Sequence, residues 1–531
     1  MSSTGVDYAS KSPPQSKDEE LLASLGYKQE LKRDFNWVEL LALSFSIIGV
    51  VQSIAAVLIY AIPYGGPVAM VWGWLVCSFF LMMIAFAMAE LASSAPTSGG
   101  LYYWTFKFSS PRYRKVLSWT VGYTNSVGYI AGVSGADFAT AIQMLSAATI
   151  GSGGTYIPTS GQIYGMFVGL LIFHSILASL ATRYIARLQV FYMTLNIILF
   201  LVLLVVIPVV TPPEFKNSSK FVFGTFENLS LWPNGFAFML SFLAPAWTMG
   251  GIDAGVHISE EARNASVAVP RTIVFSTFLG CLLGWAFNIV IAFNMGTDTA
   301  AILQDPIGQP MATIMFNSLG QRGTLAVWSF IIVTMNMSSM NLLTAASRQT
   351  FAFSRDGALP FSKYLYRVNS TTQTPIICVF FCATGAMLLG LLSFAGPVAI
   401  GAVFTMGVVC QYVAYSIPIA ARYLGPHPFV PGPFNLGILS LPVASTAVAF
   451  MVFMIIILLF PANTLPTAQT MNYTVVVVGG ILILSLSYYF LPVYGGRHWF
   501  TGPIRNIDAG HDVDGKSDLA EKVSSEGFDS A

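Results

Sequence analysis

Apolar runs of about 20 residues recur along almost the whole chain, and each is long enough to cross a lipid bilayer as a helix. The first run lies at about 38–61 and the last at about 473–494. Within a bilayer only helices and closed barrels satisfy all of their backbone hydrogen bonds. The composition agrees, because 55% of the 531 residues are hydrophobic and only 9% are charged. The pattern predicts an all-α polytopic membrane protein.

Twelve transmembrane helices are expected from these runs. The apolar runs lie at about 38–61, 68–91, 117–147, 162–181, 188–210, 235–257, 272–295, 323–350, 375–394, 397–421, 437–460 and 473–494. Polar segments flank them, and we expect residues 1–35 to be a disordered cytoplasmic tail and residues 497–531 to be a second cytoplasmic tail. Residues 36–496 then form the membrane domain.

The basic residues indicate how the chain is oriented in the membrane. Of the 25 Lys and Arg residues, 22 fall before, after or between the spans on the side that carries the N-terminus. The opposite side holds only Lys216, Lys220 and Arg322. Because basic loops stay in the cytosol, both termini are expected there. The plasma membrane is the expected location, and a vacuolar or other internal membrane is the alternative.

Two of the spans contain residues that interrupt a helix. In the first, Gly49 is followed by the polar Gln52 and Ser53, and we expect a half-helix to start after Gln52. In the sixth, "FLAPAWTMGGIDAGVHISEE" contains Pro245, a Gly-Gly pair and Asp253. A half-helix that starts inside the membrane offers free N–H groups to an anion. Interrupted helices at matching positions of two inverted halves are typical of transporter binding sites. The alternative is a pair of kinks satisfied by neighbouring helices.

Several stretches resemble a known family. "GGIDAGVHISEEARNASVAVPRTI" (250–273) is similar to the sixth helix and following loop of the amino acid–polyamine–organocation superfamily. More narrowly, it resembles the fungal amino acid/choline transporter family, which includes GABA and choline permeases. The resemblance extends to "AELASSAPTSGGLYYW" (89–104), "SRQTFAFSRDGALP" (347–360) and "FVPGPFNLG" (429–437).

The resemblance implies a leucine-transporter-type fold that works by alternating access. Twelve helices would form a five-plus-five inverted repeat, with helices 1 and 6 broken. The first repeat would span about 38–210 and the second about 235–421, followed by helices 11 and 12 at about 437–494. Carried over by position, the substrate-binding residues are Gln52, Ser53 and Ile54 for a carboxylate, Trp247 as an aromatic cover, Thr248 and Gly250 as exposed backbone, and Asp253 as an acidic gating residue. The "VQSI" sequence departs from a small-residue motif, so Gln52 is expected to narrow the pocket or to contact the substrate.

Further polar residues within or beside the spans are candidates for coupling and gating. Asp137 is interpreted either as a proton carrier or as a residue of a water-filled vestibule. Ser338 and Asn341 share one face of the eighth span, where they would hold a coupling cation or join helices by hydrogen bonds. Glu90, Glu260 and Glu261 would form an inner gate of ion pairs or a solvated network that ties loops together.

These observations favour a secondary active transporter that imports amino acids or related amines such as GABA, coupled to H⁺. The open alternatives are a choline or polyamine carrier of the same family, a channel, and an amino-acid sensor. Enzyme signatures such as HExxH, GxSxG and the P-loop are missing from the sequence, so we expect no enzyme, no cofactor and no metal site. The net charge of +1 gives no reason to expect nucleic acid as a partner.

Overall fold

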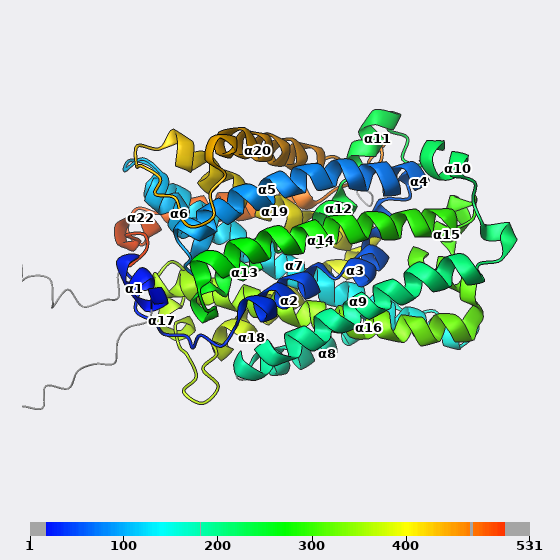
Figure 1. Ribbon diagram of the computed structural model, residues 1–531, viewed down its shortest axis with the longest axis horizontal. Coiled ribbons are helices and arrows are strands. Elements are labelled where there is room, and N and C mark those ends of the chain that lie inside the picture. The colour runs from blue at the N-terminus through cyan, green and yellow to red at the C-terminus, as the bar shows by residue number, and fades with distance from the viewer. Residues whose placement is uncertain (1–16, 181, 468–470, 505–531) are drawn as a thin grey trace, which may run out of the picture. The chain divides into compact units, whose positions relative to one another are not determined.

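The computed structural model describes residues 17–180, 182–467 and 471–504. Contacts divide the chain into a larger unit, Leu31–Pro503, and a smaller one that contains helix α1 (Lys17–Ser24). In the larger unit the long helices lie side by side with their axes roughly aligned (Figure 1). A polytopic helical membrane protein, as expected from the sequence, is confirmed.

Helical segments occupy all twelve ranges expected from the sequence. The first five ranges contain α2 (Trp37–Ile48) with α3 (Val50–Val57) and η1 (Leu58–Tyr60), then α4 (Gly66–Val68), η2 (Ala69–Gly73) and α5 (Trp74–Ser94), then α7 (Arg114–Gly151), α8 (Ser160–Ala178) and α9 (Thr182–Val210). The later ranges contain α11 (Asn234–Leu240), α12 (Leu243–Thr248) and α13 (Ala254–His257), then α14 (Ala265–Phe293), α16 (Pro310–Arg355), α18 (Ile376–Gly390) with η5 (Leu391–Ala395), α19 (Pro397–Leu424), α20 (Ser440–Ile457) and α21 (Thr474–Phe490).

Short elements connect the long helices, and one of them follows the last long helix. They are α6 (Gly100–Phe108), η3 (Pro213–Phe215), α10 (Ser219–Gly224), η4 (Ser259–Glu261), α15 (Thr299–Gln304), α17 (Ser362–Leu365), η6 (Gly437–Leu439), α22 (Gly496–Trp499), and the strands β1 (Tyr64–Gly65) and β2 (Glu227–Asn228). The two strands pair antiparallel, with Tyr64 opposite Asn228. This pairing joins the loop after the first span to the loop before the sixth.

Among the described residues, nine helices are long and apolar enough to cross a membrane on their own. Three of the expected spans do not meet this criterion of length and hydropathy, and the structure shows why. The sixth is divided into short segments, and α21 has only 17 residues. The third, α7, buries polar side chains such as Asn125, Asp137 and Gln143 along its length. The exact count of twelve crossings and the inverted repeat therefore stay predictions.

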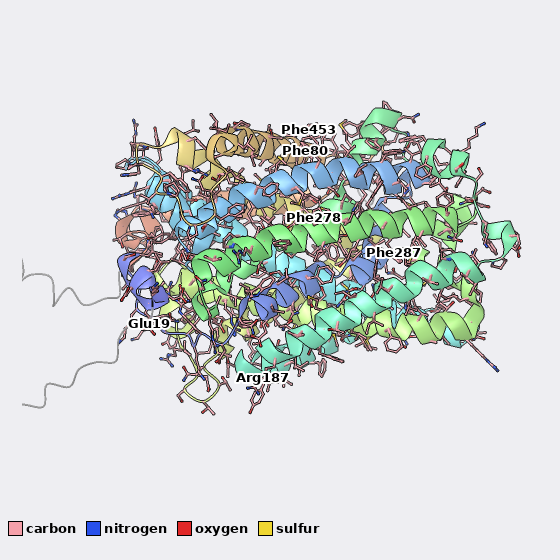
Figure 2. All side chains as sticks on the ribbon, in the orientation of Figure 1. Glu19, Phe80, Arg187, Phe278, Phe287 and Phe453 are labelled. Atoms are coloured by element: carbon pink, nitrogen blue, oxygen red, sulfur yellow. The ribbon has the colours of Figure 1, made fainter. Side chains whose placement is uncertain are left out.

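Burial separates central helices from peripheral ones. In their most apolar windows, 94% of the first span and 83% of the tenth are buried, against 33% for α8 and 28% for the fifth span. Peripheral helices carry exposed aromatic side chains on their outer faces. Phe278 on α14 and Phe453 on α20 are examples, and both are labelled in Figure 2. An outward-facing apolar surface of this kind suits contact with lipid.

The first span breaks at Gly49, as expected. Gly49 has φ 47°, which ends α2 in the left-handed conformation, and α3 begins at the next residue. The expectation that the second half-helix starts after Gln52 is wrong. The interruption is one residue long because a single left-handed glycine is enough to break the helix, and α3 follows without further unwound residues. Gln52 and Ser53 thus lie inside α3, and the Ser53 amide donates to the Gly49 carbonyl.

The sixth span is interrupted over residues 249–253, between α12 and α13. Gly251 has φ 79°, and a Cβ atom there would lie 3.2 Å from Ile47 Cγ2 in the first span. Gly280 of α14 is just as close to both breaks, since its Cβ would lie 2.8 Å from Ile48 and from Met249. The two breaks are therefore in contact, and glycine is what allows it.

The expected disorder of residues 1–35 is wrong for part of that range. α1 is helical, with Asp18, Glu19 and Glu20 in its first turn, where acidic side chains favour a helix. Leu31 and Phe35 are each only 1% exposed, and the Phe35 amide donates to the Glu261 carbonyl. Leu31 and Phe35 thus hold the end of this range, residues 31–35, within the larger unit. Residues 1–16 and 505–531 lie outside the described part of the chain.

Candidate functional site

The two helix breaks enclose a small central cavity of about 30 Å³. Its lining residues come from the first, third, sixth, eighth and tenth spans: Ile47, Ser53, Gly132, Ala136, Trp247, Thr248, Gly250, Ser338, Leu342, Gly407, Val408 and Gln411. None of these side chains is charged. One water needs about 10–15 Å³ of such space, so the cavity has room for only about two or three waters. An amino acid can therefore enter only if the walls move apart.

The polar groups at the first break are bonded within the protein. Ser53 Oγ donates to the Ile48 carbonyl at 2.7 Å, and Ser338 Oγ donates to the Ile47 carbonyl at 2.8 Å. These are carbonyls at the C-terminal end of α2, which have no helical partners of their own. Both serines also line the cavity. They are thus positioned to exchange a backbone bond for a bond to a ligand.

Of the three first-span candidates, only Ser53 reaches the cavity lining. Gln52 points toward the fifth span, where its Nε2 donates to Asn196 Oδ1 at 2.8 Å. Its Oε1 is buried without a hydrogen-bond partner among the described residues. Gly49 accounts for part of this placement, because a Cβ there would lie 2.0 Å from Gln52 Nε2. Ile54 is also buried outside the cavity lining.

Aromatic side chains separate the central cavity from a larger one. Trp247 packs against Phe404 with ring centroids 5.1 Å apart, and Phe404 packs against Tyr60 at 5.6 Å. Beyond Tyr60 lies a second cavity of about 260 Å³, lined partly by Tyr64, Leu243 and Asn472. The three rings form a partition between the two spaces. We call the end of the bundle that holds the larger cavity the vestibule end.

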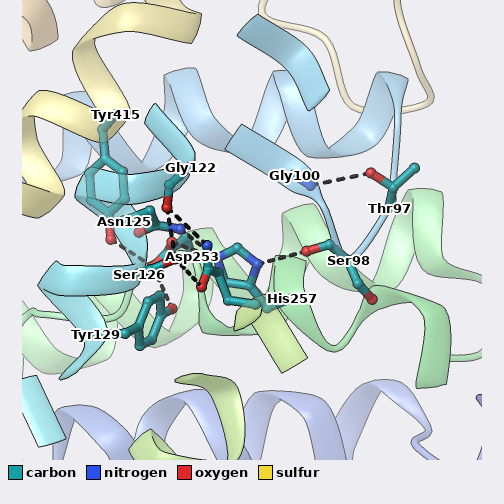
Figure 3. A network of polar contacts seen from close by, with 11 residues as sticks. Thr97, Ser98, Gly100, Gly122, Asn125, Ser126, Tyr129, Asp253, His257 and Tyr415 are labelled. Atoms are coloured by element: carbon teal, nitrogen blue, oxygen red, sulfur yellow. Dashed lines mark hydrogen bonds and ion pairs between the residues drawn. The ribbon is translucent and has the colours of Figure 1, made fainter. Parts of the chain in front are cut away.

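Asp253 lies outside the central cavity, in a buried hydrogen-bond network (Figure 3). Its Oδ1 accepts from the hydroxyls of Tyr129 and Tyr415, each at 2.7 Å. Its Oδ2 lies 2.9 Å from His257 Nε2, and His257 Nδ1 lies 2.8 Å from the Ser98 carbonyl. Asp253 is fully buried. The carboxylate thus joins the third, sixth and tenth spans and the loop after the second.

His257 has three polar neighbours. A carbonyl accepts only, so Nδ1 carries a proton toward the Ser98 carbonyl. Nε2 lies 2.9 Å from Asp253 Oδ2 and 3.0 Å from the amide nitrogen of Asn125 on α7. The imidazole therefore connects the sixth span to the third through Asn125 and also contacts the Asp253 carboxyl.

At the end opposite the vestibule, three buried ion pairs join the spans. Arg348 Nε donates to Glu261 at 2.8 Å, Arg355 holds Glu260 through two bonds of 2.8 and 3.0 Å, and Arg422 Nη1 donates to Glu90 at 2.7 Å. We call these three pairs the ion-pair cluster. Glu90 accepts also from Ser440 Oγ and the Leu436 amide. The cluster fastens α5, α16 and α19 to the loops at this end.

Glu260 lies in η4, outside the membrane-spanning segments, and is fully buried. Burial alone would raise its pKa, but the Arg355 guanidinium and the Ser98 amide outweigh this and hold the pKa below its ordinary value of 4.5. The carboxylate is therefore ionised at neutral pH, and its charge is matched by a charged, hydrogen-bonded partner.

The remaining coupling candidates lie apart from one another. Asp137 is buried against His174 of α8 at 2.5 Å. Asn341 exchanges two hydrogen bonds with Gln189 of α9, at 2.8 and 2.9 Å, and is outside the cavity lining. Ser338 lines the cavity. Asn341 therefore joins two helices, which is the simpler of the two roles expected for that face.

Sequence reasoning missed several partners in these networks. They are Tyr60, Arg355, Phe404, Gln411, Tyr415 and Arg422. A buried arginine near a span end is a signal that could have identified Arg355 and Arg422, because such a charge needs a carboxylate. The aromatic residues carry no such signal, since many similar residues face lipid.

Comparison with known proteins agrees with this architecture. The profile of the family described as amino acid permease matches residues 35–482. The chain is 38% identical to the GABA-specific permease of Saccharomyces cerevisiae, over 92% of this chain and 86% of that protein. It is 36% identical to an amino-acid permease of Schizosaccharomyces pombe, over 92% and 89% of the two chains. It is 34% identical to amino-acid permease 2 of Neurospora crassa, over 93% and 90%. The helical membrane fold, the broken first and sixth spans and these matches lead to one conclusion: the chain belongs to the amino acid permease family of membrane transporters.

Proposed function

We propose that this permease imports a small zwitterionic amino acid, with γ-aminobutyrate as the first candidate, by H⁺-driven alternating access. The observation that carries the proposal is the uncharged cavity between the two helix breaks. The relative named GABA-specific permease supports the choice of candidate.

The charge of the cavity favours a zwitterion over a cation. A ligand with net charge would lose its water in a space whose twelve lining residues carry no counter-charge, and that costs several kcal/mol. A zwitterion is neutral overall. Its carboxylate suits the N-terminal end of α3, and its ammonium group suits the carbonyls at the end of α2, because the helix dipoles have those signs.

Two closures support alternating access. The Tyr60–Phe404–Trp247 rings close the cavity toward the vestibule end, and the Asp253 network with the ion-pair cluster closes it toward the other end. We assign the ion-pair cluster to the cytosolic side, with both termini, since the basic residues gather there. The plasma membrane is the proposed location, and a vacuolar or other internal membrane is the alternative.

Asp253 is assigned to the gate rather than to the ligand. Two tyrosine hydroxyls and His257 already surround its carboxylate, and Asp253 does not line the cavity. Gating requires this network to break when the site opens at the ion-pair end. Ser53, Thr248, Gly250 and Trp247 remain the proposed ligand contacts.

A choline-like or polyamine-like cation is the second candidate, and the aromatic partition favours it. Trp247 and Phe404 offer ring faces to an amine through cation–π contact. The two candidates differ in the counter-charge that they need. Because the cavity lining carries no charge that could balance a cation, the cation is the second candidate.

The test uses purified permease in liposomes, with labelled γ-aminobutyrate, an inward proton gradient, and competition by alanine, choline and spermidine. We expect saturable uptake, inhibited by γ-aminobutyrate or alanine and insensitive to choline. Gly132→Val, which adds an isopropyl group at the cavity wall, should abolish uptake. Gly165→Val is the matched control, since a Cβ there meets nothing within 4 Å. Strong inhibition by choline would replace the first candidate with the second.

A further inference from the structure

Asp137 and His174 form a second buried acid–imidazole pair, outside the central cavity and the ion-pair cluster. His174 Nδ1 lies 2.5 Å from Asp137 Oδ1, and both side chains are 0% exposed. The other ring nitrogen, Nε2, lies 3.1 Å from Asn336 Oδ1. The trio thus joins α7, α8 and α16.

The orientation of Asn336 fixes the protonation of this pair. Its Nδ2 donates to the Ile332 carbonyl at 2.8 Å, so its oxygen, not its amide nitrogen, must face His174. An amide oxygen accepts only, and therefore Nε2 carries a proton. Nδ1 faces a carboxyl oxygen, and that contact needs a second proton, on either the imidazole or Asp137. Asp137 and His174 together thus hold one proton more than a carboxylate and a neutral imidazole.

Losing that proton would leave a net charge of −1 in a buried place. Asp137 Oδ2 has no hydrogen-bond partner among the described residues, so the carboxylate is supported through one oxygen only. Asp253 differs, because two tyrosine hydroxyls support its ionised form whether or not His257 is charged. Of the two pairs, Asp137–His174 is the one whose stability depends more on the bound proton.

Several charged and titratable groups on the helices packed around the pair are engaged elsewhere or exposed. Tyr129 of α7 and Tyr415 of α19 both bind Asp253, and Tyr164 of α8 donates to the Met387 carbonyl. The arginines form ion pairs or are exposed: on α16, Arg348 holds Glu261, Arg355 holds Glu260 and Arg322 is exposed, and on α19 Arg422 binds Glu90. On α18, Cys378 contacts Leu365 and Cys382 contacts Thr350. None of these contacts supplies a cation to Asp137.

The trio of Asp137, His174 and Asn336 shares two helices, α7 and α16, with the central cavity. Ala136, next to Asp137 on α7, lines the cavity, and so does Ser338, two residues after Asn336 on α16. Successive helical residues point about 100° apart, so each helix presents one face to the cavity and another to the pair. Ser338 also bonds to the Ile47 carbonyl at the first break. A change in how α7, α8 and α16 pack would therefore move the cavity wall.

We propose that Asp137 and His174 bind the proton that drives transport, with Asn336 as the positioning residue. The inference rests on the proposed function, since it assigns the proton site of that same carrier. A proton taken from water on the acidic side neutralises the pair and holds α7, α8 and α16 together. Its release to water on the other side leaves the buried charge and favours separation of the three helices. One proton crosses per cycle and no covalent bond changes.

The test separates proton coupling from substrate handling. Asp137→Asn and His174→Gln are reconstituted in liposomes and assayed for γ-aminobutyrate exchange, for uptake driven by a pH gradient, and for proton entry reported by an internal pH dye. We expect exchange to stay within about twofold of wild type, while gradient-driven accumulation and substrate-induced proton entry are lost. Ser175→Ala is the control, because within the described part of the chain this buried hydroxyl on α8 bonds only to the Leu171 carbonyl of its own helix.

A third variant keeps the proposal testable if the first two fail to fold. Asn336→Leu removes the acceptor that requires a proton on Nε2, so the pair should bind its extra proton less tightly. The pH of half-maximal driven uptake should fall by about one unit, the size of one hydrogen bond to a charged group. An unchanged pH profile in folded Asn336→Leu, or normal proton entry in Asp137→Asn, overturns the proposal. Wild-type uptake without any proton entry would instead refute the proton coupling in the proposed function.

Discussion

Gly49 gives the first span its break through two separate constraints. Its φ of 47° suits glycine, and a Cβ atom would overlap the Gln52 amide. The sequence predicted this break, because glycine beside polar residues within an apolar run is a local signal. It did not predict where Gln52 points. That direction depends on Asn196, 144 residues away, which no local pattern encodes.

Gly49→Ala should therefore impair the permease more than backbone strain alone can explain. Left-handed alanine costs about 1–2 kcal/mol, and displacement of Gln52 from Asn196 adds to that. Gly154→Ala is the control, since Gly154 has φ 84° and open space around its Cβ position. For both variants, transport is measured as uptake and stability is measured by thermal unfolding of the detergent-purified protein. Equal losses in the two would show that the Gln52 contact contributes nothing.

Trp247 is the residue whose truncation should most affect ligand affinity. It lines the central cavity and packs against Phe404 with the two rings tilted by 37°. Loss of a desolvated aromatic–amine contact, about 1–2 kcal/mol, weakens apparent affinity by roughly tenfold or more. Trp247→Phe keeps a ring and should be milder than Trp247→Ala. Concentration-dependent uptake gives the measurement, and an unchanged half-saturation constant in the alanine variant would remove Trp247 from the site.

At the scale of elements, α16 connects the first break to the ion-pair cluster. It carries Ser338 at the first break and, toward its C-terminal end, Arg348 and Arg355 in the ion-pair cluster. The apolar runs predicted the helices well, because length and hydropathy are local properties. The apolar runs did not predict the pairing of Glu260 with Arg355. The two residues are 95 positions apart, and sequence patterns do not report distances between helices.

The Glu260–Arg355 pair should make the permease sensitive to acid. The folded pKa of Glu260 is below 4.5, so the stabilisation is complete above 4.5 and is lost as pH falls through the folded pKa. Glu260→Gln should therefore show a smaller loss of thermal stability between pH 5 and pH 3 than wild type, with both melting curves measured in one buffer series. Parallel curves would show that this carboxylate does not control acid unfolding.

Removal of the Arg355 side chain alone should destabilise the fold more than removal of both charges of the Glu260–Arg355 pair. Arg355→Ala leaves the buried Glu260 charge without its guanidinium, which costs about 3–5 kcal/mol. The double variant Arg355→Met with Glu260→Gln should recover much of this stability. Lys363→Ala, a change at an exposed basic residue, serves as the control. Chemical or thermal unfolding reports all four proteins, and a double variant no more stable than Arg355→Ala would argue against a penalty from unpaired charge.

At the scale of the whole molecule, the orientation in the membrane can be tested with single cysteines. All five native cysteines are buried, so an introduced exposed cysteine should react selectively. Lys220→Cys and Ser370→Cys place one at each end of the bundle, and both positions are exposed. In intact cells a membrane-impermeant maleimide should label residue 220 only, and permeabilisation should reveal residue 370. Labelling of residue 370 in intact cells would reverse the assigned orientation.

The central cavity of about 30 Å³ has a consequence for which molecules are carried. Because the cavity is this small, it discriminates between solutes when it closes around a bound molecule and not when the molecule first binds. A molecule with the right end groups but a longer middle would enter, be held, and then prevent the far side from opening. Such a molecule would be a blocker, and the longest compound still delivered across the membrane would measure how far the walls can stretch.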